Sequence, residues 1–314
     1  MKELPQSLFD VYALSLPRGH GFGCSPPIGA WQSNDGLACG VITYNDNKLV
    51  FGILVLRRRV DHVWTTTSCI NDIPSFDKAL SQLSVLLKEN NPPEPLPPGI
   101  VPRPILFDLA KRNPSDIFRL LTRPSHHVAA WMLNQLYLSL PNPDSNWASD
   151  CQTENFHTRL WEAQLLASFR EQGLLVSQTY PSPDFYIENR QGRMVWVEAV
   201  TANPQQRYNH VNNTASEAPE DRKERFLGVA AERFAKTLGN KLGKKYHDLS
   251  HVAGQPFVIA LADFHAPSSM TWSREALMCY LYGIYPFVEE DNGCRYASAQ
   301  PVTHLPGKSK FPAG

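Results

Sequence analysis

The chain has 314 residues, and its 30 lysines and arginines balance its 30 aspartates and glutamates. With 42% hydrophobic residues, this composition predicts a globular protein of one or two domains and excludes an intrinsically disordered chain. Neutrality also argues against a protein that coats nucleic acid over its whole surface, although a local basic face stays compatible with it. We find no signal peptide, no apolar run that could span a membrane and no CxxC pair, so we expect a cytoplasmic protein.

The first half of the chain predicts an antiparallel sheet followed by helices. In residues 28–67, strand-like runs flank an Asn-Asp-Asn turn, a pattern typical of a hairpin. Residues 76–89 and 126–140 have the apolar spacing of helices. Between them, the prolines of residues 91–104 predict a rigid connector, because neither a helix nor a central strand continues through so many prolines.

The second half of the chain has the pattern of an α/β domain. We place it at residues 146–314, after an N-terminal domain of residues 1–145 whose role the sequence does not indicate. The fold class expected is mixed α+β or α/β, with an antiparallel N-terminal sheet and a core in the order α-β-β-α-β followed by a last helix. The predicted elements are a helix at 156–172, strands near 183–188 and 193–201, a helix at 221–247, a strand at 256–264 and a helix at 274–285.

One acidic residue interrupts the most apolar of these strands. In residues 193–201, side chains alternate between two faces, and both faces are apolar apart from Glu198. This pattern indicates a central strand with an embedded carboxylate. Such a charge needs a cation or several hydrogen-bond donors, because burying it alone costs free energy.

Two further acids take inward positions in the neighbouring elements. Glu162 lies three and four residues before Leu165 and Leu166, which puts it on the apolar stripe of its helix. Asp184 follows Pro183 at the entry to its strand. Three carboxylates on one α-β-β unit can form a site for a hard divalent cation, Mg²⁺ or Mn²⁺, which favours carboxylate oxygens and keeps waters for a substrate phosphate.

This constellation resembles the PD-(D/E)XK nuclease superfamily, whose fold is restriction-endonuclease-like. The resemblance covers residues 155–265: Glu162 matches the helix glutamate, Pro183 and Asp184 the Pro-Asp pair, and Glu198 the second acid. It implies a Mg²⁺- or Mn²⁺-dependent endonuclease that acts on nucleic acid, DNA in the first instance. Asp184 and Glu198 would then hold the metal ion, and Glu162 would orient the site or help to hold a second ion.

The family expects a lysine two residues after the second acid, where this chain has Val200. Some members supply the lysine from the following helix. At about 100° per residue, Lys241 lies on the inner stripe of the helix predicted over 221–247, with Lys245 beside it, whereas Lys236 points nearly opposite. We therefore expect Lys241 to complete the catalytic set of Glu162, Asp184 and Glu198, with Lys245 as the second candidate. The role of Lys241 would be to position the attacking water and to stabilise charge at the scissile phosphate.

Two basic segments could contact phosphate. Residues 221–246 carry eight basic against three acidic residues, and from these we predict nucleic-acid contacts for Arg233, Lys236, Lys244 and Lys245. A solvated helix face is the other interpretation. The segment LRRRVDH at residues 56–62 could also contact phosphate, but a solvated strand edge is the favoured interpretation there.

Nearly the whole chain also resembles a group of uncharacterised bacterial proteins, in stretches such as RLWEAQLLASFREQG, VEAVTANP and PFVIALADFHAPSSMTWSREAL. This resemblance implies a bacterial cytoplasmic protein and no particular substrate. No histidine zinc motif, GxSxG elbow or phosphate-binding glycine loop is present. Two functions stay open: a metal-dependent nuclease, and an inactive nuclease-like fold that binds nucleic acid or protein, in which Glu198 and Lys241 form a structural pair. A homodimer is compatible with both.

Overall fold

The computed structural model describes residues 1–13, 25–88, 92–110, 112–189, 191–204, 214–306 and 308–312. The chain folds into two compact units, residues 1–197 (unit 1) and residues 198–314 (unit 2), which are divided inside strand β8 (Met194–Ala202). The class is mixed α+β, as the sequence predicts. The domain boundary predicted near residue 145 falls inside unit 1, between helices α4 (His127–Ser139) and α5 (Trp147–Gln152).

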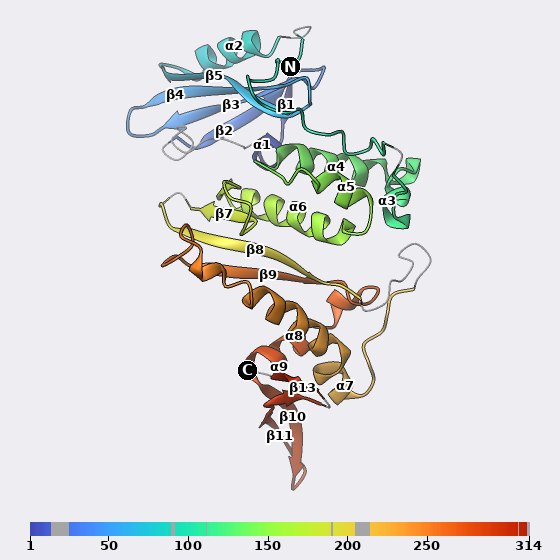
Figure 1. Ribbon diagram of the computed structural model, residues 1–314. Helices are drawn as coiled ribbons and strands as arrows, with labels where there is room; N and C mark the ends of the chain where they lie inside the picture. Colours follow the sequence, from blue (N-terminus) through green and yellow to red (C-terminus); the bar gives the residue numbers. More distant parts are fainter. Residues whose placement is uncertain are drawn as a thin grey trace. The chain divides into compact units, whose positions relative to one another are not determined.

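Unit 1 begins with a five-stranded antiparallel sheet in the order β1-β2-β3-β4-β5, which confirms the sheet predicted over residues 28–67. Alternate residues of β3 face opposite sides: Ala38 and Ile42 pack under α2, whereas Cys39 and Val41 pack under α1. Figure 1 shows the two helices on opposite faces of this sheet. The elements are β1 (Lys2–Leu4), α1 (Gln6–Ala13), β2 (Pro27–Gln32), β3 (Ala38–Asn45), β4 (Val50–Arg58), β5 (Trp64–Ile73) and α2 (Phe76–Leu86).

The three arginines at the end of β4 are not the solvated edge that we expected from the sequence. Arg57 and Arg58 are 5% and 8% exposed. Arg57 pairs with Glu94 of the proline-rich connector at 3.3 Å, and Arg59 donates to Asp61 at 2.7 and 2.9 Å. The reason is that the connector packs beside the strand, since the backbone of residue 94 hydrogen bonds to residues 58 and 60. Buried guanidinium groups need such acceptors.

Unit 1 continues with a group of helices and ends in an antiparallel ribbon of strands. Helix α6 (Phe156–Glu171) matches the predicted helix closely, and it is preceded by α3 (Asp116–Leu121), α4 and α5. The ribbon pairs β6 (Leu175–Ser177) with β7 (Phe185–Glu188), and β7 with residues 194–197 of β8. The short strand β6 is an addition to the predicted order.

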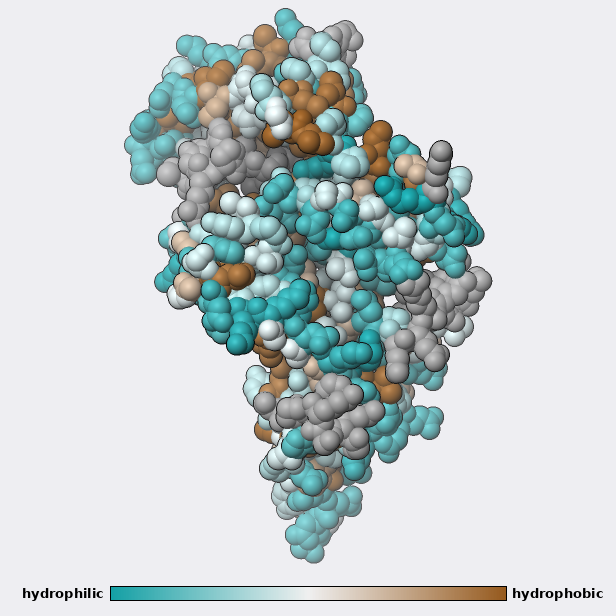
Figure 2. All heavy atoms as spheres, viewed as in Figure 1, coloured by the Kyte–Doolittle hydropathy of each residue, from teal (hydrophilic) through white to brown (hydrophobic). Residues whose placement is uncertain are grey.

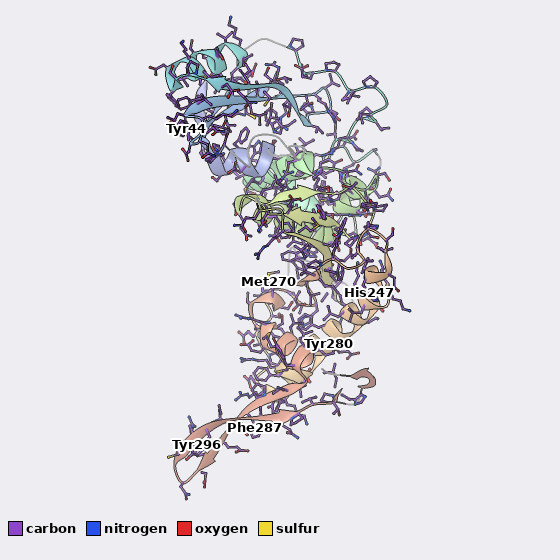
Figure 3. The ribbon with its side chains drawn as sticks, turned by 90° about the vertical axis from the view of Figure 1, so that its left-hand side faces the viewer. Tyr44, His247, Met270, Tyr280, Phe287 and Tyr296 are labelled. Atoms are coloured by element: carbon purple, nitrogen blue, oxygen red, sulfur yellow. The ribbon has the colours of Figure 1, made fainter. Side chains whose placement is uncertain are left out.

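Unit 2 contains the end of β8, strand β9 (Phe257–Asp263) and helices around an apolar core. That core includes Ala231 and Phe234 of α8 (Val229–Leu242) and Ala276 of α9 (Arg274–Tyr282). The sequence did not predict the hairpin of β10 (Ile284–Asp291) and β11 (Cys294–Pro301), which Figure 3 marks by Phe287 and Tyr296. Its outer part is mainly hydrophilic on the face shown in Figure 2. The remaining strands are β12 (His304–Leu305) and β13 (Lys308–Pro312).

The single helix predicted over residues 221–247 is wrong in two places. It breaks at Gly228 into α7 (Arg222–Leu227) and α8, and it ends at Leu242. At the break, a Cβ on residue 228 would lie 2.3 Å from the backbone carbonyl oxygen of Glu224, which cannot move aside, so the kink favours glycine. The chain then turns at Lys245, which has a left-handed φ of 51°, into a 3₁₀ turn at Tyr246–Asp248.

Candidate functional site

Glu198 lies on β8 and is buried, with 5% of its side chain exposed. One of its two carboxylate oxygens, Oε1, accepts two short hydrogen bonds. Lys241 Nζ donates to it at 2.6 Å, and Tyr246 Oη donates to it at 2.6 Å. The ion pair stabilises the buried charge and joins the end of α8 to the strand, so the inward position of Lys241 predicted from the helix geometry is confirmed.

The second carboxylate oxygen of Glu198 is different. Oε2 is buried and has no hydrogen-bond partner among the residues that the structure describes. A carboxylate oxygen has room for two donors or one cation, and leaving it unpaired in the interior costs free energy. Such an orphan oxygen needs an explanation, and a bound ion is one of the standard explanations.

Tyr246 is the member of this site that sequence reasoning missed. It is 4% exposed, and its ring stacks on Phe257 of β9 with centroids 5.2 Å apart. The Nζ of Lys244 lies 5.9 Å above the same ring, a cation–π distance. Tyr246 was missed because the helix was predicted to continue to residue 247. The helix ends at Leu242 instead, and the left-handed turn at Lys245 directs the Tyr246 side chain toward Glu198.

Glu162 of α6 sits in a closed network inside unit 1. Its Oε1 accepts from Arg159 Nη1 at 2.8 Å, and its Oε2 accepts from Arg159 Nη1 at 3.1 Å and from Trp147 Nε1 at 2.8 Å. Arg159 also donates to Asp150 at 2.6 Å and Asp144 at 3.1 Å. Burial raises the pKa of Glu162, and the charge and hydrogen bonds of Arg159 oppose that shift. The position on the apolar stripe is confirmed, but both oxygens are already engaged.

Asp184 directly precedes β7 and is half-buried. The next residue, Phe185, pairs in register with Val197, and Glu198 is the residue after Val197. In the described part of the chain, no group of three or more His, Cys, Asp or Glu side chains could hold a metal ion. Metal binding by Asp184, Glu198 and Glu162 therefore stays a prediction.

The four basic residues predicted to contact nucleic acid fall into two kinds. Arg233 of α8 donates to the backbone carbonyl of Asn203 through Nε at 2.9 Å and Nη2 at 2.5 Å, so part of its guanidinium is occupied. Lys236, Lys244 and Lys245 are exposed, but the last two follow the end of α8 instead of lying on the helix. Exposure makes these lysines available to phosphate, and their contacts with nucleic acid remain predictions.

The buried carboxylate of Asp263 was also missed by sequence reasoning. Asp263, at the end of β9, accepts from His265 Nδ1 at 2.8 Å, from the backbone of His265 at 3.0 Å and from Ser273 Oγ at 2.6 Å. Burial by itself would raise the pKa of Asp263, but these hydrogen bonds and the charge of His265 hold it below its ordinary value. His265 is close to Asp263 in sequence. Ser273 reaches Asp263 only because of the fold of the loop between them, and periodicity does not predict that fold.

No protein-family model, no curated protein and no solved structure matches the chain. Among the helices of the described residues, none combines the length and the apolar character that a membrane crossing requires.

Proposed function

We propose that the chain is a metal-dependent nuclease that hydrolyses phosphodiester bonds, DNA first among its substrates, in the cytoplasm. Mg²⁺ or Mn²⁺ would be its cofactor. The observation that carries the proposal is the half-satisfied carboxylate of Glu198: Lys241 and Tyr246 hold Oε1, and Oε2 is buried without a partner among the described residues. Mg²⁺ and Mn²⁺ are hard cations that take carboxylate oxygens as ligands, so this oxygen fits the ion.

The strand register supports Asp184 as the second ligand. Phe185 and Val197 are partners in the antiparallel β7–β8 pair, and Asp184 and Glu198 are their next neighbours along the two strands. Glu162 is not part of the proposed metal site, because Arg159 and Trp147 occupy its oxygens.

The resident side chains would divide the remaining work. A bound Mg²⁺ would supply Lewis-acid stabilisation of charge on the phosphate. Lys241, which is 24% exposed and held by Glu198, keeps its ammonium in place, where it can orient a water and stabilise charge at the scissile phosphate. Tyr246 donates the second hydrogen bond to the same carboxylate oxygen of Glu198. Val200, in the place of the motif lysine, is 2% exposed and takes no part.

Exposed cations near the end of α8 support a polyanionic substrate. Lys236, Lys244 and Lys245 are exposed, and Lys244 lies over the ring of the same Tyr246 that bonds Glu198. Lysines on a surface bind phosphate through charge, and this attraction weakens as salt is added. We therefore propose that Lys244 and Lys245 hold the nucleic-acid backbone beside Glu198 and Lys241, and that Lys236 and Arg233 contact it from other faces of α8.

The first test is calorimetric titration of Mg²⁺ and Mn²⁺ into wild type, Glu198→Gln and Asp184→Asn, alone and with a DNA duplex. Glu171→Gln, at the exposed end of α6, is the matched control. Cleavage of single-stranded DNA, duplex DNA and RNA is then followed with and without metal. We expect binding and cleavage in wild type and in the control, and loss of both in the two site variants while their unfolding curves stay cooperative.

Wild-type metal binding and cleavage in Glu198→Gln would overturn the proposal. The alternative is an inactive nuclease-like fold that binds nucleic acid or protein, and the closed Lys241–Glu198 pair is the observation in its favour. Salt-sensitive DNA binding that needs no metal, with no cleavage of any of the three substrates, would support this alternative.

A further inference from the structure

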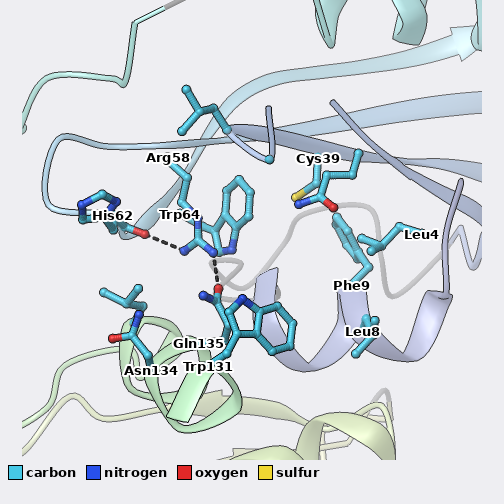
Figure 4. Close-up of a pocket in the computed structure, with 14 residues that line it drawn as sticks. Leu4, Leu8, Phe9, Cys39, Arg58, His62, Trp64, Trp131, Asn134 and Gln135 are labelled. Carbon is cyan, nitrogen blue, oxygen red and sulfur yellow. Dashed lines mark hydrogen bonds between the residues drawn. The ribbon is translucent and has the colours of Figure 1, made fainter. Parts of the chain in front are cut away.

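Unit 1 contains a cavity of about 370 Å³ that the site in unit 2 does not use. Strands β2 to β5 and the ends of β1 and α1 line one side of it, and α4 lines the other (Figure 4). Trp131, Asn134 and Gln135 share one face of α4 by their spacing of three and four residues, and all three line the cavity. The volume is within the range of small-molecule sites, ~300–1,000 Å³.

One residue that lines this cavity, Trp64, has a buried hydrogen-bond donor without an acceptor among the described residues. Trp64 is 8% exposed, and its indole Nε1 has no hydrogen-bond partner among the described residues. Buried indole N–H groups usually find an acceptor, so this one points to a missing acceptor. Asn134 and Gln32 add side-chain amides to the lining, each with donors and an acceptor.

The same cavity is aromatic and carries one fixed cation. The Arg58 guanidinium lies 3.8 Å from the centre of the Trp64 ring and donates to the His62 carbonyl at 2.5 Å and to Gln135 Oε1 (Figure 4). Burial lowers the pKa of Arg58 to about 10, so it remains charged at neutral pH. Trp131 is 50% exposed at the edge of the cavity, where a planar ligand could stack on its ring.

We propose that this cavity binds a single nucleobase, presented by a single strand or turned out of a duplex. A base is planar and stacks on aromatic rings, and its edge offers donors and acceptors to the amides of Asn134 and Gln32. Asn and Gln amides can pair bidentately with base edges, as they do with adenine. A lipid tail would leave these polar groups unpaired, and a free phosphate would not use the tryptophan faces.

This inference rests on the proposed function, because it supplies a base-reading element to a chain that we propose to act on nucleic acid. It assigns recognition of the base to unit 1, whose N-terminal sheet takes no part in the proposed hydrolysis, and leaves backbone hydrolysis to Glu198 and Lys241.

The test compares two labelled single-stranded DNA oligonucleotides of equal length, one with all bases and one in which the central nucleotides are abasic. Their binding to the full chain in EDTA is measured by fluorescence anisotropy for wild type, Trp131→Ala, Asn134→Ala and the control Tyr282→Ala, whose exposed side chain lies in α9. We expect wild type and Tyr282→Ala to prefer the base-containing strand by about tenfold, the magnitude typical of base–aromatic stacking. Trp131→Ala should reduce this preference to about twofold, and Asn134→Ala should weaken it for some bases more than for others.

Equal binding of the two strands by wild type, no binding of either, or a full preference in Trp131→Ala would overturn the inference. The proposed function fails separately. Metal-dependent cleavage without a base preference would overturn the cavity assignment alone, whereas a base preference that depends on Trp131 without any cleavage would support the cavity and overturn the nuclease.

Discussion

Glu162 in unit 1 and Glu198 in unit 2 are both buried glutamates on apolar faces, and each accepts hydrogen bonds from a cation and from an aromatic residue. Arg159 and Trp147 serve Glu162, while Lys241 and Tyr246 serve Glu198. The two networks differ in how completely they are satisfied. Both oxygens of Glu162 have donors, whereas Oε2 of Glu198 has none among the described residues.

This difference leads us to interpret the two glutamates differently. A buried polar network with every group satisfied makes the core rigid and needs nothing more, while a half-satisfied network is unfavourable unless something else completes it. The cations differ in the same way. Arg159 is divided among three carboxylates inside unit 1, whereas Lys241 pairs with Glu198 and is partly open to solvent. We therefore treat Glu162 as an anchor between α5 and α6 and Glu198 as a ligand.

The largest expected effect is on cleavage. Lys241→Met removes the ammonium beside the phosphate, and we expect the cleavage rate to fall about 100- to 1,000-fold, the usual loss for a group that stabilises transition-state charge. Lys241→Arg keeps the ion pair with Glu198 but moves the charge, so it should restore the unfolding free energy without restoring the rate. Lys78→Met, an exposed lysine of α2, is the control. Full activity in Lys241→Arg would contradict a specific catalytic role of Lys241 and leave the Lys241–Glu198 pair as a structural contact.

The next effect is on stability and concerns the complete network. Glu162→Gln weakens the hydrogen bonds of Arg159 and Trp147 to this position while Asp150 and Asp144 still compensate Arg159, and we expect the free energy of unfolding to fall by about 2 kcal/mol. Urea unfolding of this variant beside Glu171→Gln, on the exposed end of the same helix, measures the difference. Metal binding by the folded protein should stay unchanged. A loss of metal affinity at full folding would return Glu162 to the metal site.

A smaller effect is expected from Tyr246→Phe. The change removes one of the two donors to Glu198 Oε1 but keeps the ring stacked on Phe257, so the cost is one hydrogen bond to a charged group, about 1–2 kcal/mol. Urea unfolding measures it, with Tyr282→Phe as an exposed control. If the two variants have the same stability, Tyr246 does not hold the carboxylate and the site is looser than its distances indicate.

Local periodicity predicted the parts of this comparison that lie within one element. The apolar stripe of α6 placed Glu162 inside, and the apolar strand β8 placed Glu198 inside. The angle of Lys241 relative to Phe234 and Leu238 was sufficient to bring it to Glu198, because all three lie before the helix ends. Arg159 could have been found in the same way, since it is three residues before Glu162 on the same helix.

Periodicity could not predict the hydrogen-bond donors that lie beyond a turn from the element that carries each glutamate. Trp147 reaches Glu162 from a separate short helix, and Tyr246 reaches Glu198 after a left-handed turn at Lys245. The inner stripe of the helix predicted over residues 221–247 would also bury Leu242, but Leu242 is 64% exposed because α8 ends there. The break at Gly228 depends on its close approach to Glu224, a contact that helix propensity alone does not predict.

The smallest expected effect is a change in how steeply the free energy of unfolding falls with pH. It tests whether a buried acid has a structural role because its hydrogen bonds are satisfied, whichever unit it lies in. Asp263 lies in unit 2 like Glu198 but is satisfied like Glu162, by His265 and Ser273. Its pKa is lowered in the folded chain, so in acid the unfolded chain binds more protons than the folded one. The stability that Asp263 contributes is therefore present above its unfolded pKa of about 3.9 and is lost as the pH falls through the lower folded pKa. Urea unfolding between about pH 6 and pH 2 should show a shallower acid decline in Asp263→Asn than in wild type, with cleavage per folded molecule unchanged at neutral pH. Parallel profiles would mean that Asp263 does not contribute in this way, and a loss of cleavage would show that a satisfied network can also belong to the active site.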